Sequence, residues 1–428
     1  MAMSKVLIVE PRDPLIARDG KPFGVGVSAS TLPFPFPSTI TGGVRTRAGL
    51  AGGSFVDSAG VPNKVLIETV KQISTSGALL VELNDQGDIV DWLAPAPADA
   101  LLLENKADRK QAQVKRLVPI DKEDGVTSIK DPPHASDDLA PVGLPRFDPS
   151  KPIDTAPRFW QWAKFEQWLL DPETISSPHN IAELGISGLA TEARTHVAID
   201  PGKWTAREGQ LFQTRGLEFT QCQEKKIEEA KRLALAIRVD SGEEEPDKLI
   251  QAIKEGLSPL GGERRTVMWR ESKQSFPSNP FVGDLANTIE SQQIKASRVV
   301  LLTPAYFTEG SRPTWLLAKR YGTQPQLVGI ANTRAQVTSG WDFEHYEKKA
   351  NGRVVRGRPK KSRRLMPAGS VLFLKFDNGK NIREWIENTW MSCVSDDSTE
   401  GDIDQHRRDG FGLAAIGVWD GKLQPMKF

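Results

Sequence analysis

Apolar residues occur in many short runs, each bounded by glycine, proline or charge, and this pattern predicts more strands than helices. Strands are expected at Val6–Val9, Val65–Val70, Ala78–Leu83, Ile89–Leu93, Ala100–Leu103, Glu192–Asp200, Leu217–Thr220, Leu233–Val239, Thr266–Trp269, Ser297–Leu302, Leu327–Ile330 and Ser370–Phe376. Helices are expected at 40–52, 159–170, 246–254 and 382–393. Strands mixed with a few helices favour an α+β fold with antiparallel sheets.

Between Pro11 and Arg47 the chain combines proline, glycine and charge in an order that favours an anion site. Prolines at alternate positions stiffen an extended approach, because proline fixes φ and disfavours helix in the residue before it. Ser38 or Thr39 can then cap a helix that starts near Ile40 and exposes backbone amides at its N-terminus.

The start of this helix carries the other features that phosphate binding requires. Gly42 and Gly43 cost helix stability relative to alanine, so we expect a close backbone approach there. Arg45 and Arg47 follow, and guanidinium groups bind phosphate through paired hydrogen bonds. The residues alone leave a second interpretation open, an ordinary strand-to-helix entry with solvated arginines.

Two further stretches of the first half have distinct compositions. Eight prolines fall between Pro119 and Pro157, which predicts a long irregular insertion. Aromatic residues at helical spacing follow it, around Trp162, Phe165 and Trp168. Such a cluster is more typical of a core or a protein interface than of a base-stacking platform.

In the second half, cations gather beside a strand and a glycine turn. The alternation in Glu192–Asp200 places Arg194 and His196 on one face of a strand. Arg264 and Arg265 directly follow the pair Gly261–Gly262. These positions are candidates for phosphate contacts.

Nine lysines and arginines, with no acid among them, fall between Lys348 and Arg364. This basic arm is either a solvated hairpin or a segment that follows phosphates, because clustered cations gain affinity by releasing counterions. Near the end, Asp409–Trp419 is a glycine-rich loop that leads into a last strand. Gly410 and Gly412 there allow the backbone to approach a phosphate or a neighbouring backbone. Too few residues follow for a dinucleotide-binding unit.

Composition narrows the class of protein. At 428 residues, with 38% hydrophobic and 26% charged residues, the chain is expected to be a soluble two-domain protein. No signal peptide or membrane span is expected, and two distant cysteines indicate a cytoplasmic protein without a disulfide framework. A net charge of +1 still allows nucleic-acid binding if positive charge gathers on one face.

Landmarks of one kind of protein occur in order from residue 11 to residue 417. They are Pro11–Phe23, the Pro-Ser-Thr-Ile-Thr-Gly-Gly-Val-Arg helix start, Glu192–Val197, Gly209–Thr214, Gly261–Arg265, Ser339–Asp342, Pro367–Val371 and the terminal glycine loop. Together they resemble the third Cmr subunit of the type III-B CRISPR effector, a member of the RAMP superfamily.

The resemblance implies two ferredoxin-like (RRM-like) domains at 1–190 and 191–428. The first would hold the insertion at about 119–157, and the second the basic arm 348–364 and the glycine-rich loop 409–418. It also implies a subunit without nuclease activity or cofactor that binds the 5′ handle of crRNA. The implied partners are the large palm/HD-type subunit and the backbone RAMP subunits, with target RNA met only indirectly and no membrane contact.

Within this resemblance, the residues expected to contact RNA are Arg12, Arg18, Ser38, Thr39, Thr41, Gly42, Arg45, Arg47, Arg194, His196, Arg264, Arg265, Gly410 and Gly412. The competing hypothesis is a metal-independent RAMP endoribonuclease that processes crRNA, in which His196 would transfer protons. One histidine without a placed tyrosine or lysine favours a structural role instead. No catalytic residue and no metal ligand is expected. A generic RNA-binding module outside CRISPR systems would show no preference for a repeat-derived 5′ end.

Overall fold

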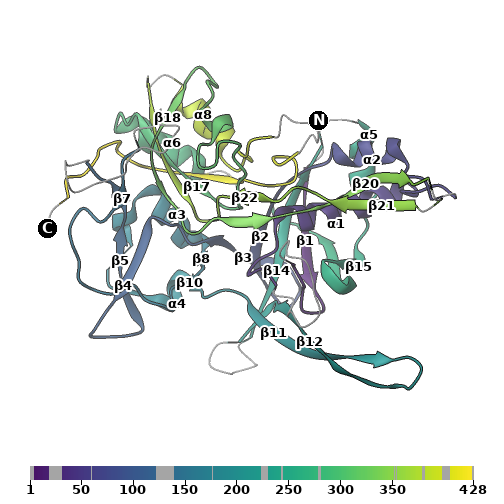
Figure 1. Cartoon of the computed structure of the whole chain (residues 1–428). Helices are drawn as coiled ribbons and strands as arrows, with labels where there is room; N and C mark the ends of the chain where they lie inside the picture. The colour runs from purple at the N-terminus through teal and green to yellow at the C-terminus, as the bar shows by residue number, and fades with distance from the viewer. Residues whose placement is uncertain are drawn as a thin grey trace. The chain divides into compact units, whose positions relative to one another are not determined.

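The computed structural model describes residues 4–18, 31–58, 60–121, 139–175, 177–222, 230–241, 244–277, 281–350, 352, 354–377, 381–397 and 405–426 (Figure 1). Residues 122–138, the centre of the expected insertion, lie outside this described part, as do residues 351 and 353 of the basic arm. The fold is mixed α/β with antiparallel sheets, as predicted.

The chain forms two compact units, and each unit is assembled from three separate stretches. Unit 1 contains Met1–Val90, Leu189–Ser275 and Val337–Arg364, and unit 2 contains the remaining residues. One crossing, from Gly188 to Leu189, lies beside residue 190, where two continuous domains were expected to meet. Strands from both halves of the sequence therefore build unit 1.

The sheet of unit 1 is antiparallel and has the order β2-β14-β1-β16-β15. Its strands are β1 (Ser4–Pro11), β2 (Ser74–Leu83), β14 (Lys231–Asp240), β15 (Gly256–Leu260) and β16 (Arg265–Glu271). The central strand β1 is apolar at consecutive positions and buried on both faces, which is why it lacks a polar alternation.

Three helices of unit 1 contact one another beside this sheet (Figure 1). They are α1 (Pro37–Gly52), α2 (Lys64–Lys71) and α5 (Glu244–Gln251). The strand predicted at residues 65–70 is wrong, because Asn63 caps α2 through its side chain and an apolar stripe drives a short helix. The predicted end of α1 near Gly52 is confirmed.

The predicted start of α1 is also wrong. Pro37 occupies the first turn and Phe36 is the N-cap, with no side-chain hydrogen bond, so Ser38 and Thr39 lie inside the helix and cap nothing. Proline is favoured at the first helical position because its missing N–H would have had no partner there. The helix therefore begins three residues earlier than predicted.

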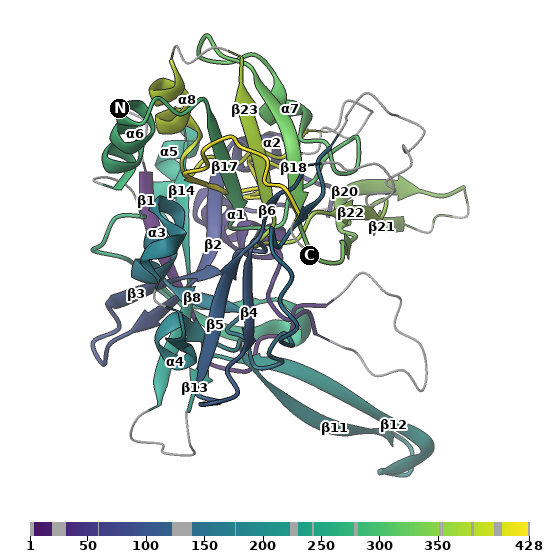
Figure 2. The same cartoon turned by 90° about the vertical axis from the view of Figure 1, so that its left-hand side faces the viewer.

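Two long ribbons belong to unit 1. In both views β11 (Ala190–Asp200) and β12 (Thr205–Glu218) form a two-stranded ribbon that extends away from the sheet of unit 1 (Figures 1 and 2). A second ribbon, the β20–β21 arm, pairs β20 (Trp341–Lys348) with β21 (Val354–Pro359) and contains much of the basic arm. The basic arm is thus part of a hairpin, and the two interpretations, a solvated hairpin and a segment that follows phosphates, both stay predictions.

Unit 2 contains an antiparallel sheet in the order β18-β23-β17-β24. Its strands are β17 (Ala296–Leu301), β18 (Pro325–Ala331), β23 (Val371–Phe376) and β24 (Ala414–Gly417). The helices around it are α3 (Trp162–Leu170), α6 (Phe281–Ser291), α7 (Thr314–Leu317) and α8 (Ile382–Thr389).

The remaining described elements are short pairings and turns. They are β3 (Ile89–Pro95), β4 (Ala100–Glu104), β5 (Gln111–Arg116), β6 (Val118–Pro119), β7 (Val142–Gly143), β8 (Phe159–Gln161), η1 (Pro172–Thr174), β9 (His179–Asn180), α4 (Ile181–Leu184), β10 (Gly185–Ile186), β13 (Thr220–Gln221), η3 (Gly262–Arg264), β19 (Gln336–Thr338) and β22 (Arg363–Leu365).

The aromatic segment after the insertion is a core element of unit 2, which confirms the core interpretation. Trp168 is buried, and its indole N–H donates to Asp99 Oδ1 at 2.9 Å. Asp99 also forms an ion pair with Arg298, and the side chains of both residues have no exposed surface. The guanidinium of Arg298 donates to the Trp168 carbonyl and lies 5.5 Å from the centre of its ring. The buried ion pair therefore joins the residue before β4 to β17, and hydrogen bonds from both of its members hold Trp168 of α3.

Candidate nucleic-acid interface

The loop that follows β1 packs against the turn between β15 and β16. The Arg12 N–H donates to the Thr266 carbonyl at 2.9 Å, and the Thr266 N–H donates to Asp13 Oδ2 at 3.1 Å. The Gly262 N–H donates to the Ile16 carbonyl at 2.8 Å. The β1 loop thus positions Arg12 beside the turn that carries Arg264.

The base of the β11–β12 ribbon joins the same loop. Leu15 and Leu217 exchange backbone hydrogen bonds of 2.9 and 2.8 Å. Gly216 permits this approach, because a Cβ there would lie 2.6 Å from the Pro14 side chain. Segments from three distant parts of the sequence therefore converge at one end of the unit 1 sheet.

Acids and arginines of these segments act on one another electrostatically. Arg194 donates to the Glu192 carboxylate, which lowers the pKa of Glu192, and the charge of Arg265 lowers it further. The same hydrogen bond raises the pKa of Arg194, and the charges of Asp13 and Glu218 add to that rise. The cluster is therefore a mixed array of charges, in which acids hold the cations in place.

The turn itself holds Arg264 in an unusual backbone conformation. Gly261, Glu263 and Arg264 have φ angles of 71°, 55° and 52°, and the two non-glycine residues are in the left-handed region that most side chains avoid. Arg265 pairs with Glu263 at 2.9 Å, whereas the Arg264 side chain is exposed. Arg264 is consequently the cation of the turn that points to solvent.

Helix α1 runs along β15 from this turn toward the far end of the strand. Near its start, Gly43 lies against Leu260, the last residue of β15, at a distance that leaves no room for a Cβ. One turn later Arg47 donates to the Lys254 carbonyl, which precedes β15, and lies 5.6 Å from the ring of Trp269. Along β15, Gly43 is therefore nearer the turn than Arg47 is, whereas Thr41, two residues before Gly43, bonds Thr75 at the opposite end of the sheet.

The predicted residues of α1 divide between two roles. Ser38 is exposed and Thr39 half-buried in the first turn, whereas Thr41 is buried and its hydroxyl bonds the Pro37 carbonyl and Thr75. Gly42 faces open space. Ser38, Thr39 and Gly42 remain candidates for ligand contact, and Thr41 is a packing residue.

Arg45 and Arg47 lie away from the convergence. Arg45 donates to the carbonyls of Ile73 and Lys71, at the C-terminal end of α2. Burial lowers the pKa of Arg47, whose guanidinium is held by Trp269 and the Lys254 carbonyl at the far end of β15. Both arginines therefore have structural partners along the helix.

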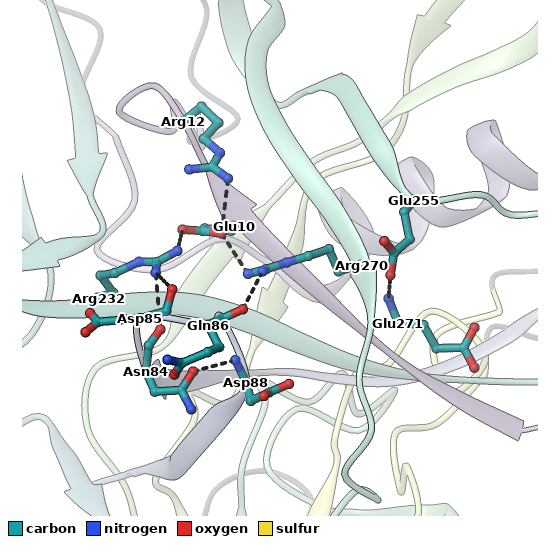
Figure 3. A network of polar contacts seen from close by, with 10 residues as sticks. All are labelled: Glu10, Arg12, Asn84, Asp85, Gln86, Asp88, Arg232, Glu255, Arg270 and Glu271. Atoms are coloured by element: carbon teal, nitrogen blue, oxygen red, sulfur yellow. Dashed lines mark hydrogen bonds and ion pairs between the residues drawn. The ribbon is translucent and has the colours of Figure 1, made fainter.

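A buried carboxylate organises the arginines next to Arg12 (Figure 3). Glu10, at 6% exposure, accepts from Arg232 at 2.6 Å and from Arg270 at 2.9 Å, and it lies 3.5 Å from Arg12. Arg232 also donates to the carbonyls of Asn84 and Asp85, and Arg270 donates to that of Gln86. Three cations around one carboxylate leave an excess of positive charge beside the β1 loop.

Sequence reasoning missed Glu10, Arg232 and Arg270 because their partners lie more than two hundred residues apart in the chain. One signal was available. Each is a charge at the end of an apolar strand, and a buried charge requires a partner.

The glycine-rich loop belongs to unit 2 and is buried there. The Gly410 carbonyl accepts from the Thr303 hydroxyl at 2.7 Å, and a Cβ at Gly412 would lie 2.8 Å from the Ser395 backbone nitrogen. Of the two expected roles, close approach to a neighbouring backbone is the one found. Arg18, in unit 1, is exposed and bridges to Thr31 through its backbone.

His196 has a hydrogen-bonded setting on the ribbon. Its Nε2 lies 2.9 Å from the Thr214 hydroxyl, and its ring stacks on Phe212 with centroids 5.2 Å apart. The placement of Arg194 and His196 on one face is confirmed by the register, which sets them opposite Thr214 and Phe212. The described residues contain no group of His, Cys, Asp and Glu that could hold a metal ion. Across the same residues, no helix is long and apolar enough to cross a membrane.

Comparison with protein families gives one match over nearly the whole chain. Residues 7–419 match the family described as "CRISPR-associated protein (Cas_Cmr3)". No curated protein matches. Among solved structures, a chain of "Cryo-EM structure of the Type III-B Cmr-beta bound to cognate target RNA" is 14% identical with a TM-score of 0.46, covering 96% of each chain. A chain of the same complex bound to cognate target RNA and AMPPnP is 15% identical with a TM-score of 0.44, covering 86% of each.

Proposed function

The chain belongs to the Cas_Cmr3 family of CRISPR-associated proteins, the third Cmr subunit of the type III-B effector, and on that premise we propose that it binds the 5′ handle of crRNA. The subunit is non-catalytic in this proposal. Its work is to hold a short single strand through phosphates, 2′-hydroxyls and a few bases, while base pairing reads the target.

The convergence of arginines at one end of unit 1 carries the proposal. Arg12, Arg194, Arg264 and Arg265 come from three segments, and their mutual placement is fixed by hydrogen bonds and acidic partners. Preordered guanidinium groups lose little entropy when they bind phosphate. Arg12, Arg194 and Arg264 have exposed side chains, so in this proposal they make the first contacts with the RNA.

The N-terminus of α1 is a second candidate element of unit 1. Helix N-termini favour phosphate because their amides lack partners and the helix dipole is positive there. Ser38 and Thr39 lie in that first turn. In the proposed complex one handle phosphate meets this first turn, and other phosphates meet Arg12 and Arg264.

The chain order of the strands supports a ferredoxin-like origin for both units. In unit 1 the order β2-β14-β1-β16 places the first strand between the third and the fourth, and helices connect the first to the second and the third to the fourth. Unit 2 repeats this order as β18-β23-β17-β24, with α7 and α8 as the connections. This is the β-α-β-β-α-β arrangement, which presents a sheet to RNA in other modules.

The proposed partners are the large palm/HD-type subunit, the backbone RAMP subunits and crRNA, in the cytoplasm. Copurification of the full chain from its native host, followed by sequencing of bound RNA, tests this. A shared repeat-derived 5′ end and the other Cmr subunits are expected. Random RNA ends would refute the handle-binding role.

The site is tested by charge reversal at Arg264. Arg264→Glu should weaken binding of a labelled handle oligonucleotide and reduce the slope of log K against log salt by about 0.7 for each phosphate that the variant no longer neutralises. The matched control is Arg383→Glu in unit 2, where an exposed arginine pairs with Glu290 at 2.6 Å. Equal affinity of Arg264→Glu and the wild type would place the RNA elsewhere.

The non-catalytic role has its own test, because some RAMP proteins cleave RNA through histidine. The Thr214 hydrogen bond and the Phe212 stacking give His196 a structural setting. Incubation of purified protein with repeat RNA should leave the RNA intact. Cleavage that His196→Ala abolishes would make the protein an endoribonuclease.

A further inference from the structure

Two tryptophans of the described chain are exposed, and one of them lies in a strongly basic setting. Trp341, at the start of β20, keeps 50% of its surface exposed, and Trp204, at the tip of the β11–β12 ribbon, keeps 84%. Indole rings are normally buried, so an exposed ring at a fixed place on a strand suggests a binding function.

Trp341 is held against the backbone of the neighbouring strand by one edge of its ring. A Cβ at Gly357 would lie 2.1 Å from the indole Nε1 and 3.0 Å from both atoms bonded to it. These distances indicate that the N–H edge, and not a face of the ring, abuts Gly357. Gly357 also has a φ of 70°, which a larger residue would rarely adopt. The contact with Gly357 holds the Trp341 ring in place, and the strand that contains Gly357 covers neither face of the ring.

Exposed cations without acidic partners lie beside this ring and farther along the arm. Lys348, Lys349, Lys361 and Arg364 are exposed, and none of the four forms an ion pair with another residue in the part of the chain that the structure describes. The nearest acid on the arm, Asp342, is already paired with Arg358 at 3.0 Å. The Lys360 N–H donates to the Gly340 carbonyl at 2.8 Å, which brings the following Lys361 beside the strand that begins with Trp341.

We propose that Trp341 is a base-stacking platform and that the β20–β21 arm binds a single-stranded segment of RNA. A base stacks on the free face of the indole, the neighbouring phosphates meet Lys361 and Arg364, and Lys348 and Lys349 at the other end of β20 meet phosphates farther along the RNA. Aromatic platforms within cationic grooves are the general means of binding single strands, because every base has a π face. The proposal deepens the proposed RNA-binding function and rests on it.

Charge decides between RNA and an acidic protein as the occupant of the arm. A protein interface buries its core and depletes that core of lysine, whereas the arm places Lys361 beside the aromatic ring and further exposed lysines at the other end of β20. Unpaired exposed cations gain affinity for RNA through counterion release. The arm therefore fits a polyanion whose subunits also carry stacking groups.

Fluorescence anisotropy with the full chain tests the platform. The probes are a labelled crRNA carrying the handle, the same RNA with a single abasic position moved along it, and a scrambled RNA of equal length. Trp341→Ala should bind the crRNA roughly 5- to 150-fold more weakly, the range for loss of one base–aromatic stack. Trp341→Phe should bind nearly as well as the wild type, and Trp204→Ala, which removes the other exposed indole, should be unchanged.

The abasic series distinguishes the loss of one stacked base from a general loss of RNA affinity. At the stacked position the abasic RNA should bind the wild type as weakly as intact RNA binds Trp341→Ala, and combining the two changes should cause no further loss. Equal affinity of Trp341→Ala and the wild type overturns the platform. Loss of the large subunit from the purified complex, with RNA affinity intact, makes the arm a protein contact and also overturns it.

Failure of the handle-binding proposal gives a different result. If the wild type binds the handle no better than the scrambled RNA, handle recognition is refuted. The scrambled RNA then still tests Trp341, because stacking tolerates any sequence. Circular dichroism and the urea midpoint of each variant establish that it is folded.

Discussion

Replacement of Asp99 by asparagine should be among the most damaging single changes in unit 2. The change preserves the shape of the side chain and an acceptor for the Trp168 indole, but it removes the charge that faces Arg298. Both members of the pair have no exposed surface, so Arg298 would keep a buried positive charge without its carboxylate. Breaking a buried pair by removing one partner costs about 3–5 kcal/mol.

Because of its surroundings, the Asp99–Arg298 pair should lose a different amount of stability depending on which partner is replaced. Arg116 lies nearby, and burial together with the charge of Arg298 lowers its pKa to about 10, while Asp99 acts in the opposite direction. In Asp99→Asn two cations remain with no acid between them. In Arg298→Met the carboxylate keeps the attraction of Arg116. We therefore expect Arg298→Met to lose less stability than Asp99→Asn.

Urea unfolding followed by tryptophan fluorescence measures the difference. With a slope of about 3 kcal/mol per molar urea, a loss of 3–5 kcal/mol lowers the midpoint by roughly 1–2 M. The control is Arg383→Met, which removes the exposed ion pair with Glu290 and should cost less than about 1 kcal/mol. The reasoning is refuted if Asp99→Asn shifts the midpoint no more than this control, or if Arg298→Met shifts it more than Asp99→Asn.

Three further expectations rest on single contacts. Gly42→Ala should raise the free energy of unfolding by about 0.5–1 kcal/mol, because no atom lies near the new Cβ. Gly43→Ala should lower it, because Leu260 and Trp269 would lie 2.8 and 3.0 Å from the new Cβ. Thermal unfolding compares the two variants, and equal melting temperatures would contradict the packing argument. Burial, with the charge of Lys164, lowers the pKa of His179, so the native state binds a proton less readily than the unfolded chain and stability should fall as the pH drops below the ordinary value of 6.5. His179→Gln should flatten this pH dependence of the urea midpoint. An unchanged pH dependence would assign it to another group. Glu10→Gln should lower the urea midpoint and speed hydrogen exchange of the amides in the 84–88 turn, because Arg232 and Arg270 lose the carboxylate that orients them. Unaltered exchange of those amides would show that the turn is held by other contacts.

Local patterns in the sequence predicted most strands correctly because each has its own apolar run and turn residues. Ala78–Leu83 and Leu233–Val239 are examples, and both are buried strands of unit 1. Val65–Val70 failed because its apolar residues fit a strand or a short helix equally well, and Asn63 outside the run decided for the helix. The cap of α1 failed in a similar way, since Pro37 rather than Ser38 begins the helix.

The candidate site was harder to predict because its geometry depends on contacts between distant residues. Arg264 and Arg194 could be selected by composition, and Glu192 and Glu263 are acids close by in the sequence. No local pattern shows that the loop after β1 brings their segments together, through Asp13 with Thr266 and Leu15 with Leu217. Arg45 had the same composition signal as Arg264, and its partners are backbone carbonyls at the end of another helix. The burial of Gly410 and Gly412 depends on Ser395 and Thr303, which no local pattern links to the loop.

The placement of β1 has a consequence for the chain as it is made on the ribosome. In the sheet, β1 pairs with β14 and β16, and the first of these strands begins at Lys231. Synthesis at 5–20 residues per second separates the end of β1 from its first partner by roughly 10–45 s. During that time an apolar strand has both of its hydrogen-bonding edges open, which invites pairing with other nascent chains. Expression of residues 1–190 alone should therefore give aggregates, and timely synthesis of the second half, or a chaperone that shields β1, becomes part of how this protein reaches its fold.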